Sequence, residues 1–135
     1  MRYFAIIVLS ILFCTNSFAF EYDTNCIDNA KTNHEVEKCG NKIVPSMEMS
    51  IKEKFNRLDK KYYDNKEMKE LLRLTKQSWI NYKNLLCNFE GAVVAGGQTS
   101  GILPLEANKA YLKCAIKLLE EMDKNLTKWE QLPLK

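Results

Sequence analysis

Apolar side chains recur at alternating spacings of three and four residues along most of the chain, a pattern that predicts amphipathic helices. The most pronounced stripe lies in a helix expected over residues 66–89, and it comprises Leu72, Thr75, Trp79, Tyr82, Leu86 and Phe89. Because a tryptophan on a helical stripe is more often core than a ligand platform, we expect Trp79, Tyr82 and Leu86 to be core residues. Cys87 closes this helix before a glycine-bearing segment.

Two further stripes have the same spacing. Pro45 suits the first turn of a second helix, whose apolar positions are Met47, Ile51, Phe55, Leu58 and Tyr62. Pro104 opens the last helix, whose stripe is Leu105, Asn108, Leu112, Ala115, Leu119, Met122, Leu126 and Trp129. We expect Phe55, Leu112 and Leu119 to lie in the core, because a seam this regular is typical of an antiparallel bundle.

The segment before these helices is less regular. Residues 20–31 show no periodicity, and we expect an extended lead-in there. Thr32 and Glu35 have the spacing of a capping box, so a short helix is expected from there to Cys39, with Gly40 at its end. The sequence therefore predicts an all-α fold, a small antiparallel bundle of three long helices plus a short N-terminal helix.

The first 19 residues have the features of a cleaved signal peptide. Arg2 provides a positive charge, and an apolar run follows over residues 4–13. Small residues at the minus-three and minus-one positions place cleavage after Ala19. Residues 20–135 would then form one helical domain, periplasmic or secreted.

Two other interpretations of this segment are weaker. Lipidation of Cys14 would require a small residue before it, and Phe13 stands there. An uncleaved membrane anchor would need a longer apolar core than this one. We therefore expect no stable membrane insertion after cleavage.

Four cysteines remain in the mature chain, and an even number in a small exported protein predicts two disulfides. Three pairings are open for Cys26, Cys39, Cys87 and Cys114. We favour Cys26–Cys39 and Cys87–Cys114, because each closes a modest loop between neighbouring elements. A zinc site is disfavoured because there is no C-x-x-C pair and His34 is the only histidine.

Composition and charge narrow the function. A hydrophobic fraction of 46% and a charged fraction of 27% over 135 residues are typical of one globular domain. Without Arg2 the mature chain has 19 Lys+Arg (20 minus 1) against 17 Asp+Glu, a net charge of about +2.

Acidic residues are interleaved with the lysines, which disfavours nucleic-acid binding. Paired thiols leave no Cys–His couple, and the carboxylates are scattered. We expect no enzyme, no cofactor and no metal.

The segment over residues 91–101 interrupts the helical pattern. The simpler interpretation is a connection that lets the chain turn back. The alternative is a binding loop held at both ends by Cys87 and Cys114, because loops on rigid scaffolds often carry function. The candidate contacts in that loop are Gly96, Gly97, Gln98, Thr99 and Ser100.

Several of these residues occur in a characteristic order. The chain contains Cys26, Thr32-x-x-Glu35, Cys39, Leu58-Asp59-x-x-Tyr62, Gln77-Ser78-Trp79-Ile80-x-Tyr82, Cys87, Gly96-Gly97 and Cys114. This order resembles the LprI N-terminal-domain family, small secreted or envelope proteins linked to lysozyme inhibition, over nearly the whole mature chain. The family's Arg-Asp pair is replaced by Lys83-Asn84, and its Asn by Asp59.

The resemblance implies an inhibitor that occludes the cleft of a lysozyme-type glycosidase. Lys83 and the loop over residues 96–101 would be its contacts with the acidic site. A net charge of about +2 gives no long-range attraction to strongly basic lysozymes. The alternative is an envelope adaptor that binds another protein, which an exposed apolar segment at residues 92–95 would favour. The sequence leaves the oligomeric state open.

Overall fold

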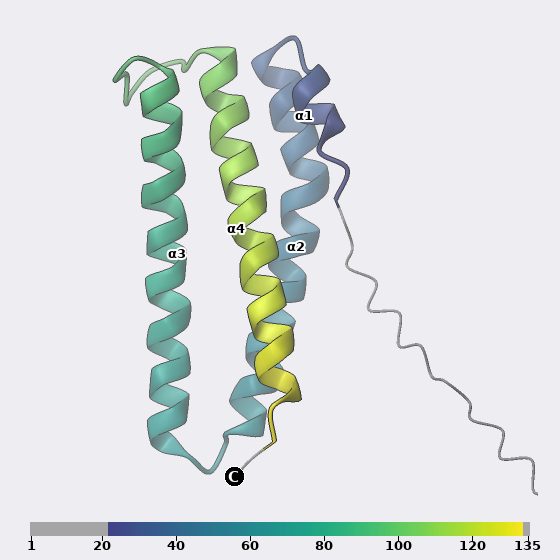
Figure 1. Ribbon diagram of the computed structural model, residues 1–135, viewed down its shortest axis with the longest axis vertical. Coiled ribbons are helices and arrows are strands. Elements are labelled where there is room, and N and C mark those ends of the chain that lie inside the picture. The colour runs from purple at the N-terminus through teal and green to yellow at the C-terminus, as the bar shows by residue number, and fades with distance from the viewer. Residues whose placement is uncertain (1–21, 134–135) are drawn as a thin grey trace, which may run out of the picture.

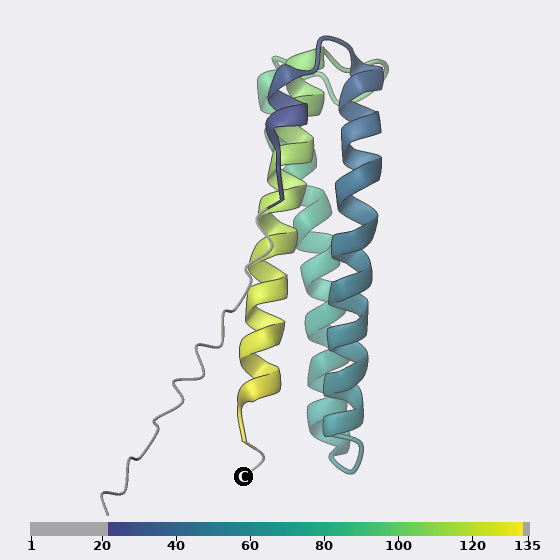
Figure 2. The same ribbon diagram turned by 90° about the vertical axis from the view of Figure 1, so that its right-hand side faces the viewer.

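A computed structural model of the chain describes residues 22–133. It contains α1 (Asn25–Asn29), α2 (Asn33–Lys61), α3 (Lys66–Val94) and α4 (Leu105–Gln131), and no strand occurs in this part of the chain. The three long helices run antiparallel to their neighbours in the chain, and α1 packs beside α2 and α4 near one end (Figures 1 and 2). The prediction of three long helices plus a short N-terminal one is confirmed. The predicted signal peptide, residues 1–19, lies outside the described residues.

The short helix is not where the sequence predicted it. The Thr32 hydroxyl does cap a helix, accepting a hydrogen bond from the Glu35 amide at 3.2 Å. That helix is α2, however, and it continues far beyond Cys39. The short helix is α1, inside the segment expected to be extended. Ile27 at its centre is fully buried, so tertiary packing stabilises a helix that has no periodicity of its own.

Gly40 was predicted to end the short helix and Pro45 to begin the next one, but both lie inside the single helix α2. A Cβ atom at Gly40 would lie 3.1 Å from Leu112 Cδ1, so the glycine allows α2 and α4 to approach closely. Pro45 removes one backbone donor and one helical hydrogen bond from the Asn41 carbonyl. The buried residues on both sides of it, Ile43 and Met47, keep this stretch packed in the core. Packing therefore outweighs two local helix-ending signals.

The central helix is α4, which packs along both α2 and α3, whereas α2 and α3 contact each other much less. The main core lies between α2 and α4 and includes the predicted core residues Phe55, Leu112 and Leu119. Trp79 is half-buried at the edge of this core. Leu86 is half-buried against a second, smaller cluster that surrounds the disulfide of α3 and α4.

Tyr82 corrects the prediction, because its side chain is 55% exposed. The fully buried positions of α3 are Cys87 and Gly91, and they face α4. At 3.6 residues per turn, these two positions lie roughly a third of a turn from the centre of the predicted stripe, so the inner face is displaced toward them. Tyr82 and Phe89, at the outer edge of that stripe, are carried into solvent as a result.

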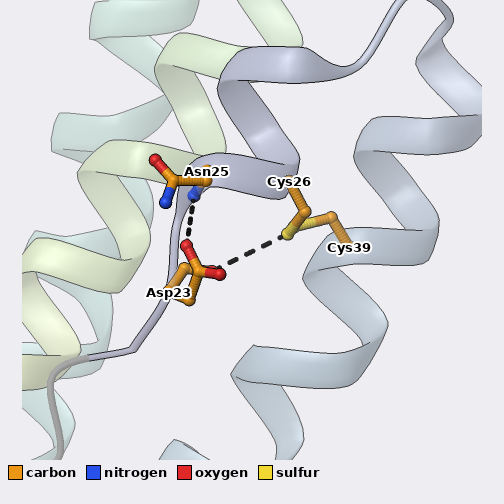
Figure 3. Close-up of a disulfide and its surroundings, with 4 residues drawn as sticks. All are labelled: Asp23, Asn25, Cys26 and Cys39. Carbon is orange, nitrogen blue, oxygen red and sulfur yellow. Dashed lines mark hydrogen bonds between the residues drawn. A yellow bond between two sulfur atoms is a disulfide. The ribbon is translucent and has the colours of Figure 1, made fainter.

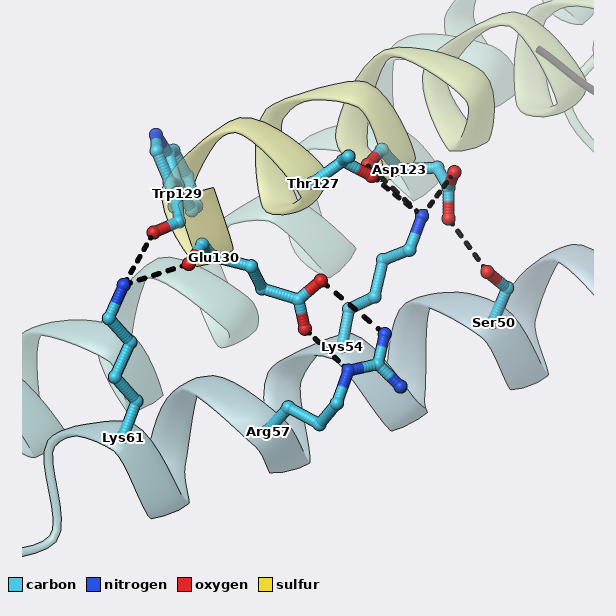
Figure 4. Close-up of polar contacts among 8 residues, drawn as sticks. All are labelled: Ser50, Lys54, Arg57, Lys61, Asp123, Thr127, Trp129 and Glu130. Carbon is cyan, nitrogen blue, oxygen red and sulfur yellow. Dashed lines mark hydrogen bonds and ion pairs between the residues drawn. The ribbon is translucent and has the colours of Figure 1, made fainter. Parts of the chain in front are cut away.

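Polar side chains line the outer edge of the seam between α2 and α4 (Figure 4). The Lys54 ammonium donates to Asp123 Oδ2 at 2.6 Å and to the Thr127 hydroxyl at 2.8 Å. The second Asp123 oxygen accepts a hydrogen bond from the Ser50 hydroxyl at 2.9 Å. This network joins the two helices where the apolar core ends.

The same seam is closed further along by Arg57 and Lys61. Arg57 Nε donates to Glu130 Oε1 at 2.7 Å, and this hydrogen bond raises the pKa of the guanidinium. The Lys61 ammonium donates to the carbonyls of Trp129 at 3.2 Å and Glu130 at 2.9 Å. Those carbonyls lie in the last turn of α4, where the Trp129 carbonyl also accepts a long hydrogen bond of 3.4 Å from the Leu132 amide, so Lys61 caps that end.

Candidate partner-binding surfaces

The four described cysteines form the two favoured pairs. The Cα atoms of Cys26 and Cys39 are 5.9 Å apart, and those of Cys87 and Cys114 are 5.4 Å apart. Figure 3 shows the first pair, with the Asp23 carbonyl oxygen 3.8 Å from Cys26 Sγ. This is a contact only, because a disulfide sulfur has no proton to donate. Two disulfides in a chain of this size indicate an oxidising compartment.

The described residues contain no group of three or more His, Cys, Asp or Glu side chains that could hold a metal ion. His34 is exposed in the first turn of α2, and each described cysteine is bonded to another. In residues 22–133 no thiol is therefore available to pair with this imidazole. Two exposed surfaces of the described residues are suited to binding a partner, the connection between α3 and α4 and the outer side of α3.

The first surface is the connection between α3 and α4, in which residues 96–102 are all exposed. The Gln98 amide braces it from inside, donating to the carbonyls of Ser100 at 3.0 Å and Ile102 at 3.2 Å. Positive φ angles of 67° at Gly96 and 94° at Gly97 turn the chain out of the helix. In Figure 1 this connection extends past the outer side of α3.

Both ends of this loop are fixed. The Cys87–Cys114 disulfide joins α3 to α4 behind it. On the α4 side, the Leu103 carbonyl accepts a hydrogen bond from the Asn33 side chain at 3.0 Å, which ties the loop to the start of α2. No charged residue occurs between Glu90 and Glu106. The loop is therefore a braced, neutral projection on a rigid base.

Lys83 is separated from the other predicted contacts. It lies about 20 Å from Gly96 along the helix, at 1.5 Å per residue. Its side chain is only 12% exposed, with the ammonium 3.3 Å from Glu48 Oε1 and 5.9 Å from the Trp79 ring centroid. The structure thus brings together the five predicted loop residues but not Lys83, which joins α3 to α2.

Lys83 is one of three lysines spaced seven residues apart along α3. Lys69 Nζ lies 3.3 Å from an Asp59 oxygen, and Lys76 Nζ lies 5.6 Å from the centroid of the Phe55 ring. Together with the Lys83–Glu48 pair, these contacts bridge α2 and α3 along much of their length. The α2–α3 seam is therefore polar where the α2–α4 seam is apolar.

The second surface is the outer face of α3, which sequence reasoning missed. We define the α3 outer face as Leu71, Leu74, Ser78, Tyr82, Leu85, Phe89 and Val93, all of them exposed. Leu85 and Phe89 are 73% and 66% exposed. The spacing repeats after 11 residues, from Leu71 to Tyr82 to Val93. An 11-residue repeat stays close to the 3.6-residue period of a straight helix, so the face runs along α3 without winding round it.

A sequence signal for this face did exist. Between residues 74 and 93 the charged residues of α3 are Lys76, Lys83 and Glu90, again seven apart. Seven residues are nearly two helical turns, so these charges share one face and leave the rest of the helix uncharged. In an amphipathic helix the charged residues normally lie on the face exposed to solvent. Lys69, Lys76 and Lys83 instead contact α2.

An apolar groove of about 250 Å³ adjoins one end of the α3 outer face, with Leu71 common to both. It lies between the end of α2, the start of α3 and the end of α4. Its lining residues are Leu58, Tyr62, Met68, Leu71, Leu72, Thr75, Trp129 and Leu132. The groove extends the apolar surface of α3 toward the core.

The chain matches no family model, no curated protein and no solved structure. No helix within residues 22–133 has the length and apolar character needed to cross a membrane. The function therefore has to be inferred from the geometry and chemistry of these surfaces.

Proposed function

We propose that this is an exported, non-enzymatic binding protein that occludes the cleft of a lysozyme-type glycosidase with the loop over residues 96–102. The observation that carries the proposal is the loop itself, which is exposed, braced by Gln98 and fixed at its base by the Cys87–Cys114 disulfide. The choice of a glycosidase comes from the resemblance to the LprI N-terminal-domain family.

The loop has the chemistry that such a cleft requires. Glycoside hydrolases use a pair of carboxyl groups beside the scissile bond, and the exposed hydroxyls of Thr99 and Ser100 can donate hydrogen bonds to them. A loop with no charge of its own enters a cleft without the cost of desolvating an ion. Because the brace holds the loop in one conformation, less entropy is lost on binding.

The test is the lysis of a peptidoglycan suspension by a chicken-type lysozyme, with and without an excess of the oxidised protein. We expect dose-dependent slowing. Ser100→Asp should abolish it, because the new carboxylate would face the acidic cleft. Asn56→Asp makes the same charge change at an exposed position of α2 and should inhibit like the wild type.

Failure of the folded protein to slow lysis would overturn the glycosidase proposal. The remaining candidate would be an adaptor that binds another envelope protein. The exposed valines at the end of α3, Val93 and Val94, favour that alternative. Equal inhibition by the Ser100→Asp and Asn56→Asp variants would instead remove the loop from the mechanism.

A further inference from the structure

We propose that the α3 outer face is the interface of a homodimer, in which the α3 helices of two copies pack antiparallel about a two-fold axis near Tyr82. This assembly is independent of the glycosidase proposal and uses a different surface. It accounts for an apolar helix face that is exposed in residues 22–133.

The first argument is the size of the face. From Leu71 to Val93 it spans 22 residues, or about 33 Å at 1.5 Å per residue. With a helix about 10 Å wide, the footprint is roughly 330 Å² before side-chain relief is counted, comparable to the largest apolar patch on a typical monomer. No other described helix lies beyond α3 on that side (Figure 1), so a second copy can reach it.

The second argument is self-complementarity. A two-fold interface must match the same surface on the partner, and the α3 outer face is nearly symmetric about its centre. Tyr82 lies midway between Leu71 and Val93. An antiparallel partner would place Ser78 opposite the partner's Leu85, and Leu74 opposite the partner's Phe89. The small Ser78 would then meet a large residue, and the aromatic rings would be spread along the interface.

The third argument is charge. The protein is positive overall, with a net charge of +3 for the full chain, so two copies repel weakly at long range. The interface would not add to this repulsion, because none of its seven residues is charged. Lys76 and Lys83, the lysines nearest the centre of α3, are engaged with Phe55 and Glu48 on the α2 side. The face can therefore be buried without burying an unpaired ion.

The footprint also sets the expected affinity. Stable interfaces bury about 800 Å² per partner, and smaller ones form transient complexes. A contact of one helix from each copy, with a footprint of roughly 330 Å², falls below that size. We expect a reversible dimer with a dissociation constant on the order of micromolar. In this antiparallel arrangement the two loops over residues 96–102 would lie at opposite ends of the dimer.

The decisive measurement is sedimentation velocity over about two decades of concentration around the micromolar range. The sample is the oxidised protein recovered from cells that express the full chain. We expect a monomer–dimer equilibrium. Leu85→Lys should raise the dissociation constant about a hundredfold or more, because it buries an unpaired charge. Met49→Lys is the matched control, since Met49 is 62% exposed on α2, away from the face, and should leave the equilibrium unchanged.

A cysteine at the proposed axis tests the geometry. In the Tyr82→Cys variant the two thiols would face each other, so mild oxidation should give a covalent dimer with the native disulfides intact. Met49→Cys should stay monomeric under the same conditions. A protein that remains monomeric throughout, or a Leu85→Lys variant that dimerises like the Met49→Lys control, would overturn the proposal. A dimer that fails to cross-link at position 82 would overturn the antiparallel arrangement.

Discussion

Helices α3 and α4 have similar lengths and similar apolar periodicity, yet they use their apolar stripes in opposite ways. In α4 the stripe is buried, with Leu119 and Leu126 fully enclosed. In α3 one apolar face, the α3 outer face, points into solvent, and two of its members, Leu85 and Phe89, are among the most exposed apolar residues described. The difference shows that apolar periodicity predicts a helix but does not predict which of its faces packs against the other helices of the chain.

The position of each helix in the bundle explains the contrast. Two long helices, α2 and α3, flank α4. Its apolar residues are therefore in contact with apolar residues of both neighbours. Helix α3 lies at the edge, and its fully buried residues face α4 only around the small cluster of Cys87, Cys114, Ala115 and Leu118, while Leu72 and Trp79 are half-buried at the main core. Its second neighbour, α2, meets it through lysines. A covalent bond and a polar seam thus replace part of the apolar packing that holds α4.

The largest expected difference between the two helices is the cost of truncating a leucine. Leu119→Ala in α4 should lower the free energy of unfolding by about 2–5 kcal/mol, because it opens a cavity at a fully buried position. Leu85→Ala in α3 should cost less than about 0.5 kcal/mol in the monomer. Urea denaturation at a concentration below that of dimer formation measures both. Equal costs would contradict the contrast between the helices.

The second difference concerns the Cys87–Cys114 disulfide. Replacing both cysteines with alanine should lower the free energy of unfolding by about 3 kcal/mol, because a loop of 27 residues is released in the unfolded chain. We also expect amide hydrogen exchange to accelerate more in α3 than in α2 or α4, because α3 has less apolar packing to hold it.

The other disulfide provides the control for this prediction. Alanine at both Cys26 and Cys39 should accelerate exchange in α1 and the start of α2, and leave α3 protected. Uniform acceleration over all helices in the Cys87→Ala/Cys114→Ala variant would show that α3 is held as firmly as the others. That outcome would remove the distinction between an edge helix and a central one.

The smallest expected difference lies in the two polar seams. Lys54→Met should lower the free energy of unfolding by about 1–2 kcal/mol, because it removes hydrogen bonds to Asp123 and Thr127 at a side chain only 15% exposed. Lys83→Met should change it by less than about 0.5 kcal/mol, because Glu48 is half-exposed and can be solvated. Chemical denaturation of the two variants makes the comparison. A larger loss of unfolding free energy for Lys83→Met than for Lys54→Met would contradict this ranking of the two seams.

Much of the fold could be predicted from the chain alone. The spacing of apolar residues predicted three long helices, and it identified Phe55, Leu112 and Leu119 as core. The disulfide pairing followed from loop lengths, and the break at residues 91–101 predicted the exposed connection. These features depend on local periodicity and chain length, which the sequence contains directly.

The rest could not be predicted because it depends on which helix lies at the centre. Helix α1 forms because Ile27 is buried against other elements, and α2 continues through Pro45 because its flanking residues are enclosed. Tyr82 faces solvent because Cys87 and Gly91 face α4, which rotates the rest of α3.

By itself the sequence predicted three long helices, favoured one pairing of the cysteines and located the segment that joins α3 to α4, because these depend on neighbouring residues and on loop length. Only the tertiary structure decided which apolar stripe is buried. A central helix has neighbours on two sides and an edge helix does not, so the apolar outer face of α3 is exposed in residues 22–133.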